Sequence, residues 1–313
     1  MARRFRLAAL AVLLLIPAAA ARAHPGTGIA VDRQGRVYFT DLKRIWRWEP
    51  GGRVTAVVTA RHSHAIRLDA DGCLEGEHLT YDPLSERWQS SAWRLEEDGT
   101  VRDTAPAAEG FPFLFTPAVA PDGTRYYAHV DNNRRDVSEI HRRTPGGRTE
   151  LLAGGAYGYA DGVGREARFG PIGAIAVGPG GELYVTDDVS VRKVSPSGRV
   201  TTLARGGRLL KPSFFARHFE GRFGKMMGLA VDSRGNVFAA NYGAGRVVAV
   251  APSGKVSSVM ESGDSWSPSG VALSGEDLFV LEYGANDSVR VRRLSSGTVT
   301  TLAVIRGGHP EKP

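Results

Sequence analysis

A recurring glycine between two short apolar strands constrains the fold of this chain more than any other sequence feature. Glycine supplies the positive φ angle that tight hairpin turns need. Six segments share an apolar strand, a glycine turn and a second apolar strand, at residues 28–41, 65–78, 116–129, 174–187, 228–241 and 270–282. Their turn glycines are Gly35, Gly72, Gly123, Gly181, Gly235 and Gly275. The recurrence predicts one structural unit built six times.

Each unit continues with a third strand, a second turn and a fourth strand, as in residues 44–58, 191–204, 247–260 and 289–303. Units of four short strands with such regular turns predict an all-β fold, a six-bladed β-propeller of four-stranded antiparallel blades. A β-sandwich would not repeat its turn chemistry six times, and a solenoid coil is usually shorter. We therefore expect residues 24–313 to form a single propeller domain.

Residues 1–23 have the pattern of a signal peptide rather than of a propeller strand. Three arginines precede an apolar run over residues 7–16, and residues 21–23 match the small–x–small pattern of a cleavage site. The run is shorter than the roughly 20 apolar residues that a membrane span needs. We expect export to the periplasm or the medium, with a mature chain beginning near His24.

Charge and cysteine content exclude several classes of protein. The formal net charge is +7, but residues 1–23 contain four arginines and no acid, and later basic residues are scattered. Nucleic-acid binding and membrane binding after cleavage are therefore not expected. The single cysteine, Cys73, allows no intramolecular disulfide, so packing must supply stability. We expect a monomer whose partner is a small molecule or a protein.

The join into the fourth unit resembles the NHL repeat. The resemblance rests on Asp161-Gly162, residues 167–169, residues 183–185 and Asp187. It implies a six-bladed NHL-type β-propeller for almost the whole mature chain. It does not fix an activity, because one fold can host many functions.

The same resemblance implies a distant similarity to the regucalcin/gluconolactonase group of metal-dependent lactonases. That group typically carries a Glu just before its first inner strand, with an Asn and an Asp on later blades. Asp187 and Asn241 could occupy equivalent places, but residues 24–27 contain no Glu. The lactonase pattern is therefore incomplete in this chain.

A polar residue recurs at the end of the second strand of every unit, and we call this set the polar column. Its members are Asp41, His78, His129, Asp187, Asn241 and Glu282. This position shares a face of the propeller with the entry to the first strand, so we expect these side chains near the channel mouth. Asp and Asn at strand ends also cap turns, and that interpretation is favoured for Asp41, Asp187 and Asn241.

Histidines concentrate in the second and third units. His62 and His64 precede one inner strand, Glu77 adjoins His78, and Asp131 and Asn132 follow His129. Imidazoles with a carboxylate suit a divalent metal such as zinc, and they also suit acid–base work near neutral pH. We expect His64, His78 and His129 to be metal ligands, unless this sector is only a solvated loop region. The full set of ligand-binding candidates is His62, His64, Glu77, His78, His129, Asp131, Asn132, Asp187, Asn241 and Glu282.

Two functional hypotheses follow. The first is an exported binding module that holds its partner at the channel mouth and the long loops around it. The alternative is a metal-dependent hydrolase, lactonase or lyase that uses the His/Asp/Glu cluster of the second and third units. No Gly-x-Ser-x-Gly sequence is present, so a serine hydrolase is not indicated.

Overall fold

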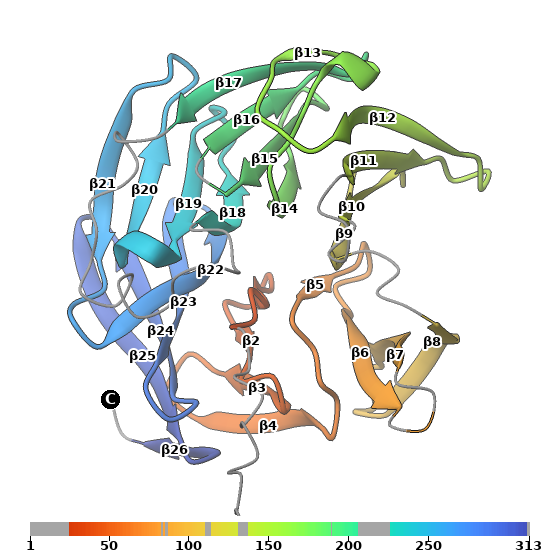
Figure 1. Cartoon of the computed structure of the whole chain (residues 1–313). Coiled ribbons are helices and arrows are strands. Elements are labelled where there is room, and N and C mark those ends of the chain that lie inside the picture. The colour runs from red at the N-terminus through yellow and green to blue at the C-terminus, as the bar shows by residue number, and fades with distance from the viewer. Residues whose placement is uncertain are drawn as a thin grey trace, which may run out of the picture.

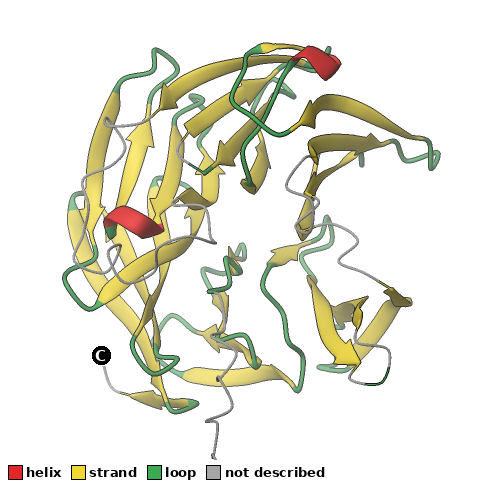
Figure 2. Cartoon of the chain, viewed as in Figure 1, coloured by secondary structure: helices red, strands yellow, loops and turns green. Residues whose placement is uncertain are grey.

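A computed structural model of the chain describes residues 25–82, 84, 87–109, 114–130, 137–188, 190–205 and 226–311. It confirms the predicted six-bladed β-propeller (Figure 1). The predicted signal segment, His24, Asp131 and Asn132 lie outside the described residues. Figure 2 shows strands and loops with very little helix.

The first three blades each contain four antiparallel strands. Blade 1 consists of β1 (Ile29–Val31), β2 (Val37–Thr40), β3 (Arg44–Trp48) and β4 (Val54–Thr59). Blade 2 consists of β5 (Ile66–Leu68), β6 (Leu74–Asp82), β7 (Arg87–Leu95) and β8 (Val101–Glu109). Blade 3 consists of β9 (Leu114–Val119), β10 (Arg125–Val130), β11 (Val137–Arg143) and β12 (Thr149–Ala156).

Blades 4 and 6 each carry a fifth strand beyond the predicted four. Blade 4 consists of β14 (Ile172–Val177), β15 (Leu183–Asp187), β16 (Ser190–Val194) and β17 (Arg199–Arg205), with β13 (Gly162–Val163) on its outer edge. Blade 5 consists of β18 (Met226–Val231), β19 (Val237–Asn241), β20 (Arg246–Val250) and β21 (Val256–Glu261). Blade 6 consists of β22 (Trp266–Ser274), β23 (Asp277–Gly284), β24 (Val289–Ser295), β25 (Thr298–Arg306) and β26 (His309–Glu311). Short 3-10 helices are η1 (Gly164–Glu166) and η4 (Tyr242–Ala244).

The glycine turns that defined the repeat are present in the structure. All six turn glycines have φ angles between +59° and +85°. A side chain at such a position would strain the backbone, so glycine is the residue that the hairpins require. Each of these turns connects the innermost strand of a blade to the second strand of the same blade. Figure 1 shows the innermost strands β5, β9, β14, β18 and β22 nearest the centre of the ring.

Successive strand residues face opposite neighbouring blades, because side chains alternate across a sheet. In β2, Val37 and Phe39 pack in an apolar cluster with blade 6. Tyr38, between them, packs in a cluster with blade 2. Both faces of a central blade strand are therefore buried, which explains why these strands are apolar along their length.

The ring closes without a strand shared between its ends. Blades 1 and 6 are each built from a continuous segment of the chain. An apolar cluster joins them, and the Tyr283 hydroxyl donates a hydrogen bond to the Thr40 carbonyl at 3.2 Å. Packing of side chains between the first and last blades therefore holds the ring closed.

Candidate functional site

Five of the six interfaces between blades contain an apolar cluster, and the sixth is polar. The clusters join blades 6 and 1, 3 and 4, 4 and 5, 1 and 2, and 5 and 6. Among the described residues, no such cluster joins blades 2 and 3. Charged and polar side chains project there instead, and we call them the polar seam: Arg67, Glu75, Glu77, Arg125, Tyr127, His129, Glu139 and His141.

The polar seam is identified by which way its strands face. In blade 3, Tyr126, Ala128 and Ile140 pack against blade 4, so the alternating positions of β10 and β11 face blade 2. In blade 2, Trp93 packs against blade 1, and Gly76 pairs with it across β6 and β7. Positions that alternate with Gly76 therefore face blade 3.

Electrostatics support this assignment of faces. Arg67 of β5 forms an ion pair with Glu75 of β6. Burial lowers the pKa of Arg67, and the charge of Glu75 opposes that effect, while Arg125 of blade 3 lowers the pKa further. The pKa of Arg67 therefore depends on the charge of a residue in the neighbouring blade.

The polar column does not form one ring of side chains around the channel mouth. Equivalent positions of successive blades are related by rotation, so each member faces the blade that precedes its own. His78 accordingly faces blade 1, whereas His129 faces blade 2, and the sheet of blade 2 lies between them. This explains why the structure does not bring these two histidines together.

Two members of the polar column cap turns, as the sequence favoured. Asp41 accepts hydrogen bonds from the N–H groups of Lys43 and Arg44, at 2.9 and 2.6 Å, and from the Trp46 indole. Asn241 caps η4 by accepting the N–H of Ala244 at 3.0 Å. Both side chains are buried.

Asp187 is engaged in a buried ion pair with Arg192 of the next strand. The Arg192 guanidinium lies 2.9 Å from Asp187 Oδ2 and 2.7 Å from Asp161 Oδ1. It also stands 5.3 Å from the centre of the Phe169 ring. Burial raises the pKa of Asp187 to about 6, against the lowering effect of Arg192. Asp161, Phe169 and Asp187 of the predicted repeat motif thus surround Arg192, which is not part of that motif.

Glu282 is held in the same way at the interface of blades 5 and 6. It is fully buried and forms ion pairs with Arg290 and, at 3.4 Å, with Arg292. Arg290 also stacks over the Trp266 ring at 4.4 Å. The role of Asp187, Asn241 and Glu282 as ligand-binding residues stays a prediction, and each has an internal partner that a ligand would have to displace.

Three histidines of blade 2 do come together, at the entry to its inner strand. His62 Nε2 lies 2.9 Å from His64 Nε2, and the two rings meet edge to face. The backbone N–H of His62 donates to His78 Nδ1 at 2.9 Å. Neutral His78 must therefore carry its proton on Nε2. Burial lowers the pKa of His62, as does the neighbouring charge of His78.

The loop that carries His62 and His64 is anchored by its own backbone. The His64 carbonyl accepts the N–H groups of Thr27 and Gly28 at 2.7 and 2.9 Å, and the His62 carbonyl accepts Leu79 N–H at 2.9 Å. A Cβ at Gly28 would lie only 3.0 Å from Ile66 N. Blades 1 and 2 together therefore fix the backbone of the loop that carries the two imidazoles.

Ser63 and Trp93 form further hydrogen bonds that hold this loop. The Ser63 carbonyl accepts the Thr40 hydroxyl at 2.8 Å, and the Trp93 indole N–H donates to Ser63 Oγ at 3.0 Å. Trp93 fits because Gly76 has no side chain, since a Cβ there would lie 2.4 Å from the indole.

Glu77 is the most perturbed carboxyl of this region. It alternates with His78 and so projects from the face of blade 2 that is turned towards blade 3. Burial raises its pKa to about 7, against hydrogen bonds from the N–H groups of Ala65 and His64 that lower it. A carboxyl with this pKa can exchange a proton near neutral pH.

His129 is grouped with two residues of β11. The ligand atoms of His129, Glu139 and His141 all lie within 4.8 Å of one another, the one such group of three found among the described residues. The predicted metal set of His64, His78 and His129 is not brought together in this way. Glu139 and His141 were missed because their pairing with His129 depends on strand register, although their i, i+2 spacing was a visible signal.

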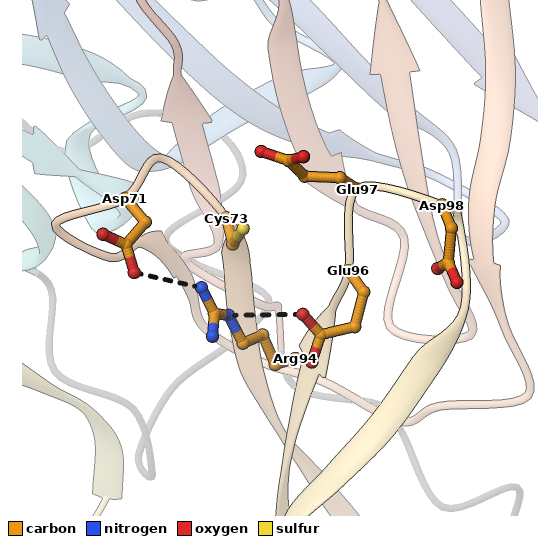
Figure 3. Close-up of a pocket in the computed structure, with 6 residues that line it drawn as sticks. All are labelled: Asp71, Cys73, Arg94, Glu96, Glu97 and Asp98. Carbon is orange, nitrogen blue, oxygen red and sulfur yellow. Dashed lines mark hydrogen bonds and ion pairs between the residues drawn. The ribbon is translucent and has the colours of Figure 1, made fainter.

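A shallow hollow of about 580 Å³ lies at the hairpin ends of blade 2. Figure 3 shows its lining, in which Arg94 lies among carboxylates and Cys73 stands beside it. Arg94 pairs with Asp69 at 3.0 Å and with Asp71 at 3.3 Å. The Arg94 guanidinium is thus paired with carboxylates of the same hairpins. Cys73 is a free, partly buried thiol.

Comparisons with known proteins support the fold and a sequence similarity over part of it. The family model described as "SMP-30/Gluconolactonase/LRE-like region" matches residues 195–281, less than a third of the chain. A comparison with curated proteins gave no match. The predicted NHL relationship stays a prediction.

Solved structures with similar folds include three at 15% identity. A gluconolactonase from Xanthomonas campestris has a TM-score of 0.59, covering 88% of this chain and 87% of its own. Regucalcin from Agrobacterium tumefaciens, described as a calcium-binding protein, has a TM-score of 0.54 with 82% and 81% covered. Virginiamycin B lyase from Staphylococcus aureus has a TM-score of 0.52 with 88% and 83% covered.

The residues of this chain do not fit the metal site that the lactonase resemblance implies. Asp187 is paired with the Arg192 guanidinium, Asn241 caps a turn, and Glu is missing from residues 24–27. A buried guanidinium beside the carboxylate repels a cation.

Within the described residues, no helix is long and apolar enough to cross a membrane.

Proposed function

We propose that this protein is an exported hydrolase or lyase that acts on a small ester or lactone, with His62 and His64 as its acid–base groups. The observation that carries the proposal is the contact of 2.9 Å between their Nε2 atoms on a loop fixed by blades 1 and 2. General acid–base catalysis needs such positioned imidazoles near neutral pH.

The contact requires a different protonation state at each of the two Nε2 atoms. One Nε2 must carry a proton and the other must accept it, because two lone pairs or two protons would repel. The lowered pKa of His62, caused first by burial, keeps its imidazole neutral at pH 7. The ring that donates through Nε2 has a lone pair on Nδ1 that can take a proton from water or substrate, and the ring that accepts carries a proton on Nδ1 that it can give to the leaving oxygen.

The comparisons support the class of reaction but not a substrate. Two of the similar structures are named for lactonase and lyase activities, and part of the chain matches the gluconolactonase-like family model. At 15% identity these likenesses support a shared fold, so the assignment depends on the histidine pair.

A panel of lactones and aryl esters tests the proposal. We expect turnover by the wild type, and His62→Gln and His64→Gln should each reduce kcat by about 10²- to 10⁴-fold, the usual contribution of a positioned acid–base group. His309→Gln is the matched control, because His309 lies on the exposed edge strand β26. Equal activity in all four proteins would contradict the assignment of the histidine pair.

An aromatic surface before blade 4 favours the binding module as a second candidate function. The Tyr157 side chain is exposed, and its hydroxyl contacts that of Tyr159 at 3.1 Å. Arg205 stacks over Tyr159 at 4.3 Å, and Tyr159 donates a hydrogen bond to Asp188 at 3.0 Å. Tyrosine and arginine are enriched where proteins bind partners. Affinity capture with the wild type and with Tyr157→Ala should recover a partner with the first only, and equal recovery would contradict this surface.

A further inference from the structure

We propose that blade 3 carries a zinc-binding site formed by His129, Glu139 and His141, facing blade 2 across the polar seam. The site stands on the geometry of β10 and β11. It therefore does not depend on the proposed role of His62 and His64.

Strand register places the three side chains on one face of the sheet. His129 pairs directly with Glu139 across β10 and β11, and Tyr127 pairs with His141. Directly opposed residues project from the same side of a sheet, as do residues two apart in one strand. Hydrogen-bonded neighbouring strands thus present the three groups from a rigid backbone, as a metal site requires.

The distances match a zinc ion with small side-chain rotations. Glu139 Oε2 lies 2.8 Å from His141 Nε2 and 3.8 Å from His129 Nδ1, and all three ligand atoms fit within 4.8 Å. A tetrahedral zinc with ligands at about 2.0–2.2 Å holds its ligand atoms about 3.3 Å apart. The separations of 2.8 and 3.8 Å in the structure lie on both sides of that value.

The donor set selects zinc rather than calcium or magnesium. Two imidazoles and one carboxylate are borderline ligands typical of zinc, whereas calcium and magnesium prefer oxygen atoms alone. Three protein ligands leave a fourth position for water or a ligand atom. The His129 side chain is 45% exposed, so an ion can reach the group from solvent.

One neighbouring cation is compatible with this site. Arg165 lies 3.7 Å from Glu139 Oε1, the carboxylate oxygen that does not contact the histidines, and its side chain is 76% exposed. Arg165 can therefore hold Oε1 while Oε2 binds the ion. Outer contacts of this kind orient metal ligands in other proteins.

Zinc titration of the tag-free protein tests the proposal, by calorimetry and by competition with a chromophoric chelator. We expect one equivalent to bind to the wild type. Loss of an outer partner weakens metal binding about 10- to 100-fold, so loss of a direct ligand should weaken it by at least about 100-fold. Glu139→Gln and His141→Ala are the variants, and zinc should raise the unfolding temperature of the wild type but not of these two variants.

His64→Gln and His309→Gln are the controls, and both should bind zinc as the wild type does. The unfolding temperature in the presence of chelator should be the same for the wild type and Glu139→Gln, which separates lost ligation from lost folding. The absence of saturable binding by the wild type would overturn the proposal. So would a loss of affinity in His64→Gln as large as that in His141→Ala.

Discussion

Replacing Arg192 by methionine tests the conclusion that the polar column is largely structural. The Arg192 side chain is 1% exposed and bonds Asp187 at 2.9 Å and Asp161 at 2.7 Å. It also donates to the carbonyls of Ala160 and Arg168, at 2.9 and 3.3 Å. Methionine fills a similar volume but leaves the fully buried Asp187 carboxylate without its cation.

Removing one partner of a buried ion pair typically costs about 3–5 kcal/mol. Asp187 can escape part of this cost by taking up a proton, because burial already raises its pKa to about 6. The destabilisation of Arg192→Met should therefore be largest at pH 7 and above, and smaller at pH 5, where the carboxyl is protonated. Adding Asp187→Leu should restore at least half of the loss, because no charge then stays buried.

Denaturant unfolding at pH 5 and pH 7 measures these differences. Arg53→Met is the matched control, since the Arg53 side chain is 69% exposed beside Glu49 and such surface pairs contribute about 0–1 kcal/mol. A cost for Arg192→Met as small as that of Arg53→Met would mean that Asp187 is open to solvent. Asp187 would then again be a candidate ligand-binding residue.

Three further predictions concern blade 2 and the proposed export of the chain. The pKa of Glu77 is 4.5 in the unfolded chain and about 7 in the folded chain, so between these pH values only the folded state binds a proton there. The free energy of unfolding should therefore fall by up to about 3 kcal/mol as pH rises through this range. Glu77→Gln should remove that fall, and identical pH profiles would contradict the raised pKa. Gly76→Ala should cost about 1–3 kcal/mol by overpacking against Trp93, and an unchanged unfolding midpoint would mean that Trp93 packs elsewhere. N-terminal sequencing of protein from the periplasm or medium should begin near His24, and an unprocessed cytosolic chain would contradict export.

The fold was predictable because the turn chemistry repeats. A positive-φ glycine cannot be exchanged cheaply for another residue, so Gly35 and its five equivalents mark the hairpins in the sequence itself. The number of blades followed directly from counting them. The glycine count did not predict the added edge strands β13 and β26. These strands are only two and three residues long, and they form by pairing with β17 and β25.

The candidate site was only partly predictable because the face of each residue matters as much as its position in the repeat. His78 and His129 occupy equivalent positions, and that equivalence is the reason they lie in different interfaces. His62 and His64 were found by their closeness in sequence to an inner strand. Arg192, Glu139 and His141 required knowledge of which residue pairs with which across two strands.

Anomalous scattering from a crystal grown with one equivalent of zinc tests most directly where this propeller binds a metal ion. The structure predicts a peak bounded by His129, Glu139 and His141, on the face of blade 3 that is turned towards blade 2. A peak beside Asp187 or Asn241 instead would contradict this prediction, because it would show that an internally bonded member of the polar column binds the ion. So would a peak between His64 and His78, which would place the metal site on the other face of blade 2.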